Sequence, residues 1–322
     1  MKRFIRFLKK SPRFLYDHSG ARHIVEMARL RDINAPGYKK PPTLFLWFLG
    51  LYVALYGIAS TRYEANLDRV ENRMSAVVAQ LSTSDEAAFK NLIAQIPGIQ
   101  KMETPLEPSL LWPLEGHFVL ASFFRKEPNP EILQWSKETL EAWKNKLAGV
   151  NLARINLSGT NLREANLSEA DLWGANLSGA DLERADLSGA DLNEANLSEA
   201  QSLKGNLSRA DLGNADLSGV VLEAADLSWA HLWKANLSGA GLFDANLSGA
   251  WLKNATLSEA NLMVANLADI RDWEAIESMK KANIQGIENA PEGFRAWALE
   301  KEAVEMDEKA WLEFLMESSA SE

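Results

Sequence analysis

A leucine returns every five residues along the middle of the chain, from Leu152 to Leu267, in twenty-four units of which only the one at Ser202 lacks it. An α-helix turns about 100° per residue, so this spacing would spread the leucines around the whole helix. In an extended strand, the Ala two positions before each Leu points to the same side as the Leu, and the Asn or Asp between them points away. The pattern therefore predicts short strands joined by turns that wind the chain into a solenoid.

A second rhythm lies over the first, because Ser follows the central Leu in every second unit from Leu157 to Leu257. Alternate units then have equivalent surroundings, so each coil of the solenoid must hold an even number of units. Hydrogen bonding in turns explains these serines without a catalytic role.

The units, such as "ANLSGADLER" from Ala175 onward, resemble the A(D/N)LXX motif of the pentapeptide-repeat proteins over about 120 residues. The resemblance implies a mainly β fold, a right-handed quadrilateral β-helix with four units per coil, in which Leu and Ala lie inside. Twenty-four units then form about six coils, in a column roughly 29 Å long. We place this domain at residues 149–269. The uncharged apolar segment at residues 43–60 and the sequence "RYEANLDRVENR" that follows it also resemble the membrane-tethered members of the family.

Two regions depart from the repeat. Ser202 replaces the central Leu of one unit and Gly205 replaces the Ala of the next unit, so we expect one side of the column to be underpacked or bulged there. After Ile270 the repeat ends, and residues 270–322 are predicted to form a C-terminal helical cap, because solenoid ends expose unpaired strand edges. Three apolar residues near that end are expected to lie beneath the cap: Phe243, Met263 and Val264.

Residues 43–60 form an uncharged apolar stretch, and we predict a transmembrane helix there. A cleaved signal peptide is the alternative, but about forty residues precede the stretch. Residues 1–42 carry an excess of Lys and Arg, which predicts a cytoplasmic N-terminus in a single-pass protein of the bacterial inner membrane. The repeats would then be periplasmic, or cytoplasmic if residues 109–124 also cross.

Residues 61–148 are predicted to form a helical stalk and capping region. Its first helix carries apolar residues in alternating steps of three and four, which favour either a coiled-coil seam between copies or a helix packed against its own domain. The seam candidates are Leu67, Val70, Met74, Val77 and Leu81. A second helix is expected after Ser84 and Asp85, and a third, capped by Asn129, is expected to cover the first coil.

The composition limits the chemistry. The chain has no Cys, a formal net charge of −10 and four scattered His residues, so we expect no catalytic residue, no metal site and no cofactor. The repeats are acidic, which argues against a nucleic-acid partner.

If positions twenty apart stack, Asp171, Asp191 and Asp211 form an acidic column, followed by His231 and Trp251. This column is either a solvated face or a stripe that binds a cation or a basic partner. The neighbouring outward column carries Trp173 and Trp233, and Trp229 lies at the preceding corner. Exposed Trp clusters mark contact surfaces, so we select Trp173, Trp229, His231, Trp233 and Trp251 as candidate partner-binding residues. Burial beneath the C-terminal helices is the alternative.

These features predict a membrane-anchored, non-catalytic scaffold whose rigid column binds an unidentified protein, with a possible homo-oligomer through the stalk or the aromatic face. One alternative is an acidic DNA mimic that shields a topoisomerase, as in some soluble members of the family. The other, by family analogy alone, is an accessory of envelope transport or lipid export.

Overall fold

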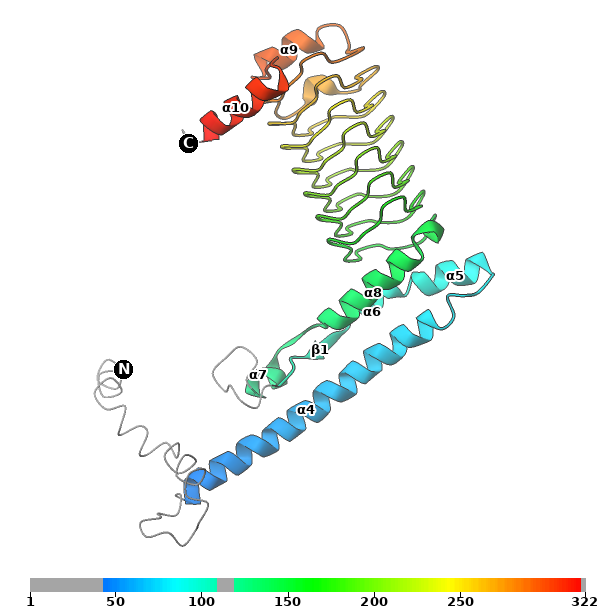
Figure 1. The fold of residues 1–322 in the computed structure, drawn as a ribbon, viewed down its shortest axis with the longest axis vertical. Helices are drawn as coiled ribbons and strands as arrows, with labels where there is room; N and C mark the ends of the chain where they lie inside the picture. The colour runs from blue at the N-terminus through cyan, green and yellow to red at the C-terminus, as the bar shows by residue number, and fades with distance from the viewer. Residues whose placement is uncertain (1–42, 109–118, 320–322) are drawn as a thin grey trace, which may run out of the picture. The chain divides into compact units, whose positions relative to one another are not determined.

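The structure is a computed structural model that describes residues 43–108 and 119–319 (Figure 1). The described residues divide into two compact units, the first formed by those up to Asp68 and those within Thr104–Glu127, and the second by Arg69–Glu103 and those from Pro128 onward. The helices and strands outside the repeats are α4 (Thr43–Val78), α5 (Glu86–Ile93), α6 (Ile96–Gln100), β1 (Glu103–Pro105), α7 (Val119–Phe124), β2 (Lys126–Pro128), α8 (Pro130–Ala142), η1 (Lys144–Lys146), η2 (Trp273–Ala275), α9 (Phe294–Glu300) and α10 (Glu308–Ser319). The predicted basic segment 1–42 lies outside the described residues.

The first unit contains the N-terminal part of α4, the short helix α7, and most of β1 and β2, which pair in a two-stranded sheet. The guanidinium of Arg62 lies 5.2 Å from the ring centre of Phe123. Seven large apolar side chains of α4 are exposed: Leu46, Trp47, Phe48, Leu49, Leu51, Val53 and Ile58.

The predicted membrane span at 43–60 is not confirmed. These residues form the first half of α4, which continues without a break into the charged sequence after Ser60. Within residues 43–108 and 119–319, none of the helices is long and apolar enough to cross a membrane. Of the candidate second crossing at 109–124, residues 109–118 lie outside the described residues, and 119–124 are the six residues of α7.

The predicted seam on the second half of α4 is mostly internal to the chain. Val70, Met74, Val77 and Leu81 are all buried, with at most 3% of each exposed, and Leu67 is half-buried. The four buried side chains have almost no exposed surface with which to contact another copy, so the structure gives no support to an oligomerisation seam through them. The alternative, a helix packed against its own domain, describes α4 from Val70 onward.

Helical elements of the second unit cover the N-terminal end of the repeats. Asp85 caps α5 and Asn129 caps α8, each through a side-chain oxygen that accepts two backbone N–H groups, as predicted for both. The side-chain amide of buried Gln100 occupies the place of a preceding strand, since its Oε1 accepts the N–H of Asn156 at 2.9 Å and its Nε2 donates to the Asn156 carbonyl at 3.2 Å. Glu141 of α8 accepts the N–H of Asn161 in the same way.

The repeats form a four-sided β-helix, which Figure 1 shows as a column of stacked coils. Parallel bridges join residues twenty apart, from Asn151 and Asp171 to Trp251 and Arg271, so each coil holds four five-residue units. The N–H of each central Leu donates to the next coil, as from Leu152 to the carbonyl of Asp171 at 2.7 Å. The sides are single bridges rather than long strands, because a turn follows every Leu.

The turn explains the residue types of the motif. In every unit from 154 to 269, the residue two positions after the central Leu has a positive φ, as the third position of a type II turn requires. The Asn or Asp side chain accepts the N–H two residues later, as Asn176 does from Ser178 at 3.0 Å. Asn and Asp are favoured there because their short side chains close such turns.

The core consists of stacked leucines and alanines, such as Leu177 and Ala175, that are almost fully buried. Ser202 and Gly205 produce no bulge, because the bridges from Gln201 to the coils on either side keep the regular register. The hydroxyl of Ser202 is buried and has no hydrogen-bond partner among the described residues. A Cβ at position 205 would overlap with this hydroxyl, so the glycine accompanies the serine.

The column extends beyond the predicted boundary at 269. Arg271 bridges to Trp251, and after a two-residue insertion at η2 the chain returns to the column at Ser278, twenty-two residues after Thr256. The first part of the predicted helical cap, residues 272–281, is therefore not an α-helix and contains only the 3-10 turn η2. Helices α9 and α10 follow, and the indole of buried Trp311 donates to the Lys281 carbonyl at 2.9 Å.

Candidate partner-binding face

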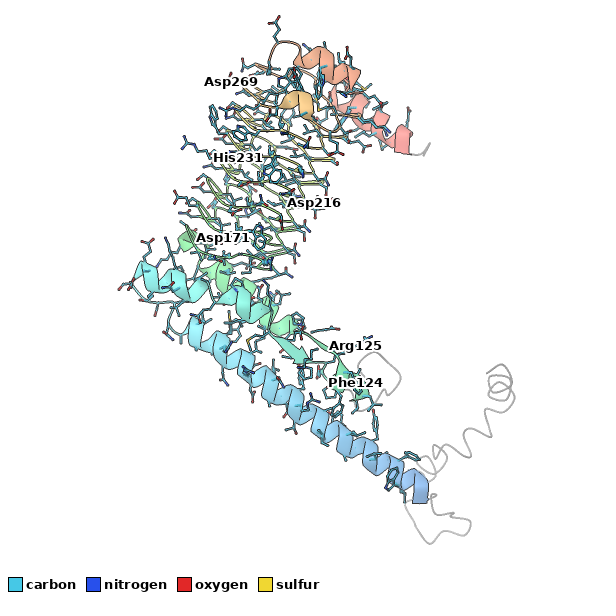
Figure 2. All side chains as sticks on the ribbon, turned by 180° about the vertical axis from the view of Figure 1, so that it is seen from behind. Phe124, Arg125, Asp171, Asp216, His231 and Asp269 are labelled. Carbon is cyan, nitrogen blue, oxygen red and sulfur yellow. The ribbon has the colours of Figure 1, made fainter. Side chains whose placement is uncertain are left out.

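The candidate residues lie on one side of the column in two stacked rows, as the sequence predicts, and Trp229 is the one candidate outside these rows. We call it the 151 face. Its bridge positions are, from the first coil onward, Asn151, Asp171, Asp191, Asp211, His231, Trp251 and Arg271. The positions two residues later, which point to the same side, are Ala153, Trp173, Asn193, Gly213, Trp233 and Lys253. Figure 2 shows Asp171 and His231 at different heights along the column.

The acidic column occupies the N-terminal half of this face. Asp171, Asp191 and Asp211 each use Oδ1 to accept the N–H two residues later, and Asp171 also accepts a bond from the amide of Asn151 through Oδ2 at 2.7 Å. None of the three carboxylates forms an ion pair with another described residue. Their negative charge is therefore not neutralised within the described part of the chain.

The C-terminal half of the face is aromatic. The rings of His231 and Trp251 stack with centres 4.7 Å apart and planes 27° from parallel. The guanidinium of Arg271 lies 5.4 Å from the Trp251 ring centre and 5.0 Å from that of Trp229. Cation–π attraction of this kind fixes the cation against both indoles. We refer to Trp229, His231, Trp233 and Trp251 as the aromatic patch.

Two of the indoles lie against glycines of the adjacent coil. A Cβ at Gly249 would lie 2.6 Å from the Trp229 ring, and a Cβ at Gly213 would overlap with the indole of Trp233. These glycines give the large rings a flat backbone to lie on. Trp229, Trp233 and Trp251 nevertheless remain 45%, 37% and 38% exposed. The described C-terminal helices therefore do not bury these three residues, so the alternative of burial beneath those helices does not apply to them.

Trp173 is separate from the patch. It is half-buried in the N-terminal half of the face, where the guanidinium of Arg154 lies 4.2 Å from its ring centre. The expectation that Phe243 and Val264 lie beneath the C-terminal helices is wrong, because they are 38% and 36% exposed, on another side of the column.

Sequence reasoning missed the cations of the patch. Arg271 lies past the predicted end of the repeats, so the prediction does not include it in the 151 face, although it lies twenty residues after Trp251. The ammonium of Lys234, the next residue in the sequence, lies 5.5 Å from the Trp233 ring centre. Arg271, Lys234 and Lys253 form no ion pair with any described residue.

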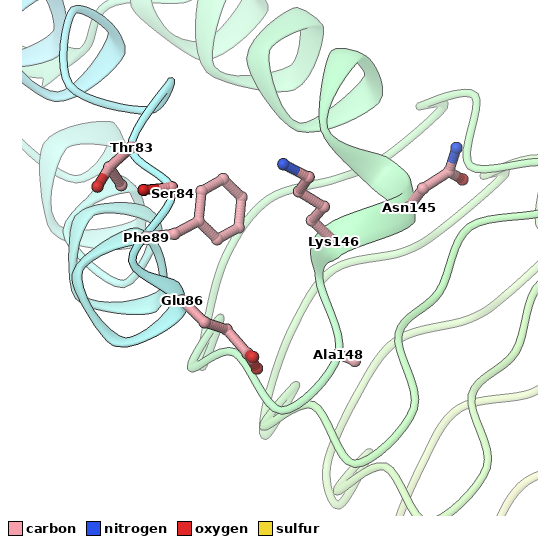
Figure 3. Close-up of a pocket in the computed structure, with 7 residues that line it drawn as sticks. All are labelled: Thr83, Ser84, Glu86, Phe89, Asn145, Lys146 and Ala148. Atoms are coloured by element: carbon pink, nitrogen blue, oxygen red, sulfur yellow. The ribbon is translucent and has the colours of Figure 1, made fainter.

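A surface pocket of about 360 Å³ lies near the N-terminal end of the repeats (Figure 3). It is lined by Thr83, Ser84, Glu86, Phe89, Asn145, Lys146 and Ala148. The Lys146 ammonium lies 5.9 Å from the Phe89 ring centre, and Glu86 pairs with Lys90 at 2.9 Å. The one acid of the pocket is thus held by a neighbouring lysine, an arrangement that offers no pair for general acid–base catalysis. Within residues 43–108 and 119–319, no group of three His, Asp or Glu residues could hold a metal ion.

Comparison with known proteins points to the repeats. The family model described as pentapeptide repeats matches residues 146–184, 165–201, 206–242 and 240–270. HetL, a pentapeptide repeat protein involved in heterocyst differentiation regulation from the cyanobacterium Nostoc sp. strain PCC 7120, is 34% identical over 50% of this chain and 76% of HetL, with a TM-score of 0.29. Rfr23, a pentapeptide repeat protein from the cyanobacterium Cyanothece 51142, is 31% identical over 31% of this chain and 86% of its own, with a TM-score of 0.28.

QnrB1, a plasmid-mediated fluoroquinolone resistance protein, is 19% identical over 53% of this chain and 91% of its own, with a TM-score of 0.31. The search of the curated proteins found no match. No catalytic family is indicated. The matched repeats, the A(D/N)LXX motif and the coil of four units agree with one another, and together they describe a right-handed quadrilateral β-helix. The chain belongs to the pentapeptide-repeat family.

Proposed function

We propose that this protein is a non-catalytic scaffold whose aromatic patch binds a protein partner. The observation that carries the proposal is the exposure of Trp229, Trp233 and Trp251 on one side of a rigid column. Clusters of exposed Trp are uncommon on the surface of a monomer, and Trp is among the residues that contribute most to binding at interfaces.

The patch is ordered before any partner arrives. Trp251 is stacked on His231, Trp229 lies on Gly249, and Arg271 lies against both indoles. Side chains that are already fixed lose little conformational freedom on binding, so more of the contact energy is available for affinity. The β-helix beneath them is held by backbone hydrogen bonds between every two neighbouring coils.

Chemical crosslinking of the full chain in cells, followed by affinity capture, tests this proposal. The double variant Trp233→Ala, Trp251→Ala should remain folded, because both side chains are exposed, and should lose the partner crosslinked by the unmodified protein. Phe243→Ala is the matched control, since Phe243 has the same exposure of 38% on the opposite side of the coil. Equal capture by the double variant and the control would contradict the proposal.

Neither alternative function gains support. A DNA mimic needs a continuous acidic surface, but the acidic column ends at Asp211 and is followed by His231, Trp251 and Arg271. The likeness to QnrB1 is too low in identity and TM-score to carry the topoisomerase hypothesis. No described residue points to envelope transport or lipid export.

Association with a bacterial inner membrane remains part of the proposal. It is supported by the exposed apolar side chains of α4 from Leu46 to Ile58 and by the excess of Lys and Arg in residues 1–42. Cell fractionation tests it: the full chain should sediment with membranes and resist a high-salt wash. Recovery in the soluble fraction would contradict the association. If the chain sediments with membranes, a topology reporter fused after Glu322 tells whether the repeats are periplasmic.

A further inference from the structure

The 151 face carries opposite charge in its two halves. Along its bridge positions and the positions two residues later, the N-terminal half contains three acids and no base, and the half from His231 onward contains Lys253 and Arg271 and no acid. None of these charged groups forms an ion pair with another described residue. A partner that complements the whole face must therefore present its basic and aromatic half opposite the acidic column.

A second copy of the same face meets this requirement. A two-fold axis that lies between two facing copies, at right angles to the column, places each row of side chains against its own equivalent in reverse order. When the axis passes between the levels of Asp211 and His231, Asp171 faces Arg271 of the other copy and Asp211 faces His231. Asp191 faces Trp251, whose indole N–H is a hydrogen-bond donor.

The neighbouring row fits the same arrangement. Asn193 faces Lys253 of the other copy. Trp233 faces the level of Gly213, which the other copy's own Trp233 indole covers, so the two Trp233 indoles face each other. Each contact occurs twice, because the interface is self-complementary. We infer that the 151 face is a self-association surface on which two copies of this chain pair in antiparallel orientation. This inference rests on the proposed function and names the partner of the aromatic patch as a second copy.

The area indicates a weak dimer. Rows 171 to 271 span five coil steps of about 4.8 Å, and one side of a coil is about three extended residues wide, roughly 10 Å. Each copy thus contributes on the order of a few hundred Å², less than the roughly 800 Å² per partner of stable complexes. Charge steering and the fixed indoles favour this pairing over others, and covalent trapping is suited to detecting it.

Disulfide trapping tests the orientation directly, because the chain contains no cysteine of its own. Two full-length single variants, Asn193→Cys and Lys253→Cys, are mixed in equal amounts under mild oxidation, one with a C-terminal tag so that mixed and like dimers differ in size. The antiparallel pairing brings position 193 of one copy to position 253 of the other, whereas two like positions lie three coils apart, beyond the reach of a disulfide.

We expect the mixed disulfide to form at least about tenfold faster than either like disulfide, since pairing raises the effective concentration of the matched thiols. Ser198→Cys with Ser258→Cys is the matched control, at the same levels on the adjacent side of the coil, and should show no such preference. Absence of the preference for 193 with 253, or its equal appearance in the control pair, would overturn the antiparallel dimer.

The two proposals fail separately. If trapping shows no preference while Trp233→Ala, Trp251→Ala still loses a crosslinked partner of another size, the second copy is not the occupant and the scaffold function stands. If the double variant captures the same partners as the unmodified chain, the aromatic patch is not a binding surface and both proposals fall.

Discussion

His231 and Trp251 stack face to face although twenty residues separate them in the sequence. Their ring centres lie 4.7 Å apart, the distance between neighbouring coils of a β-helix. Equivalent positions of neighbouring coils therefore lie side by side, and the residues of one side of the column recur in the sequence at intervals of twenty. The acidic column and two members of the aromatic patch, His231 and Trp251, are two stretches of the same row.

The buried leucines are the first test of the fold. Leu177→Asp would place a carboxylate among stacked leucines with no partner, which costs several kcal/mol. We expect a large loss in the urea midpoint of unfolding. Ser178→Ala, one residue away and facing outward, should change the free energy of unfolding by less than about 0.5 kcal/mol. Similar losses in the two variants would mean that the inward and outward positions are assigned incorrectly.

Ser202 is a second test, because its hydroxyl is buried and unpaired within the described part of the protein. An unsatisfied buried polar group costs about 1–3 kcal/mol, so Ser202→Ala should stabilise the column, by about 1 kcal/mol once the lost contacts of the oxygen are included. Urea unfolding measures the change, with Ser198→Ala in the preceding unit as the control. A clear loss of stability in Ser202→Ala would show that the hydroxyl has a partner after all.

Gln100 is predicted to hold the first coil in place of a preceding strand. Gln100→Ala leaves the N–H and carbonyl of Asn156 without their partner, and we expect a loss of about 1–3 kcal/mol in unfolding free energy. Gln95→Ala is the control, because the exposed Gln95 side chain donates a hydrogen bond to the carbonyl of Asn91 in its own segment. Equal effects of the two substitutions would remove Gln100 from the cap.

Lys137 predicts a pH dependence of stability. Burial lowers the pKa of Lys137 in the folded protein, and the charge of Glu141 partly opposes this shift. The unfolded chain therefore binds this proton more tightly, so stability rises with pH between the lowered pKa and the ordinary value for lysine. The rise is small because Lys137 is only half-buried.

In Lys137→Met this rise should be absent, whatever the change in baseline from losing the 2.5 Å bond to the Ser158 carbonyl. Urea unfolding of both proteins across the alkaline range gives the two slopes. Parallel slopes would show that Lys137 titrates alike in the folded and unfolded states.

The repeat made much of this structure predictable. A period of five determines which side chains face inward, so Leu177 and its equivalents were assigned correctly, and a period of twenty placed Trp251 on His231. The predicted end of the repeats at residue 269 was wrong because two extra residues at η2 interrupt the period of five in the coil that begins at Arg271. The seating of Trp233 on Gly213 depends on the side-chain conformation of one indole, which no repeat encodes.

The most direct test of the 151 face is a charge exchange between its two ends, read by sedimentation of the full chain over a concentration series. Asp171→Arg alone would set arginine against Arg271 twice in the dimer, and Arg271→Asp alone would set aspartate against Asp171 twice. Each single variant should associate at least about tenfold more weakly than the unmodified chain, since each pair contributes up to about 1 kcal/mol and occurs twice. An equal mixture of the two variants should associate as a mixed dimer about as well as the unmodified chain, because every carboxylate again faces a guanidinium. A mixture that stays as dissociated as its components, or single variants that associate normally, would contradict the antiparallel face.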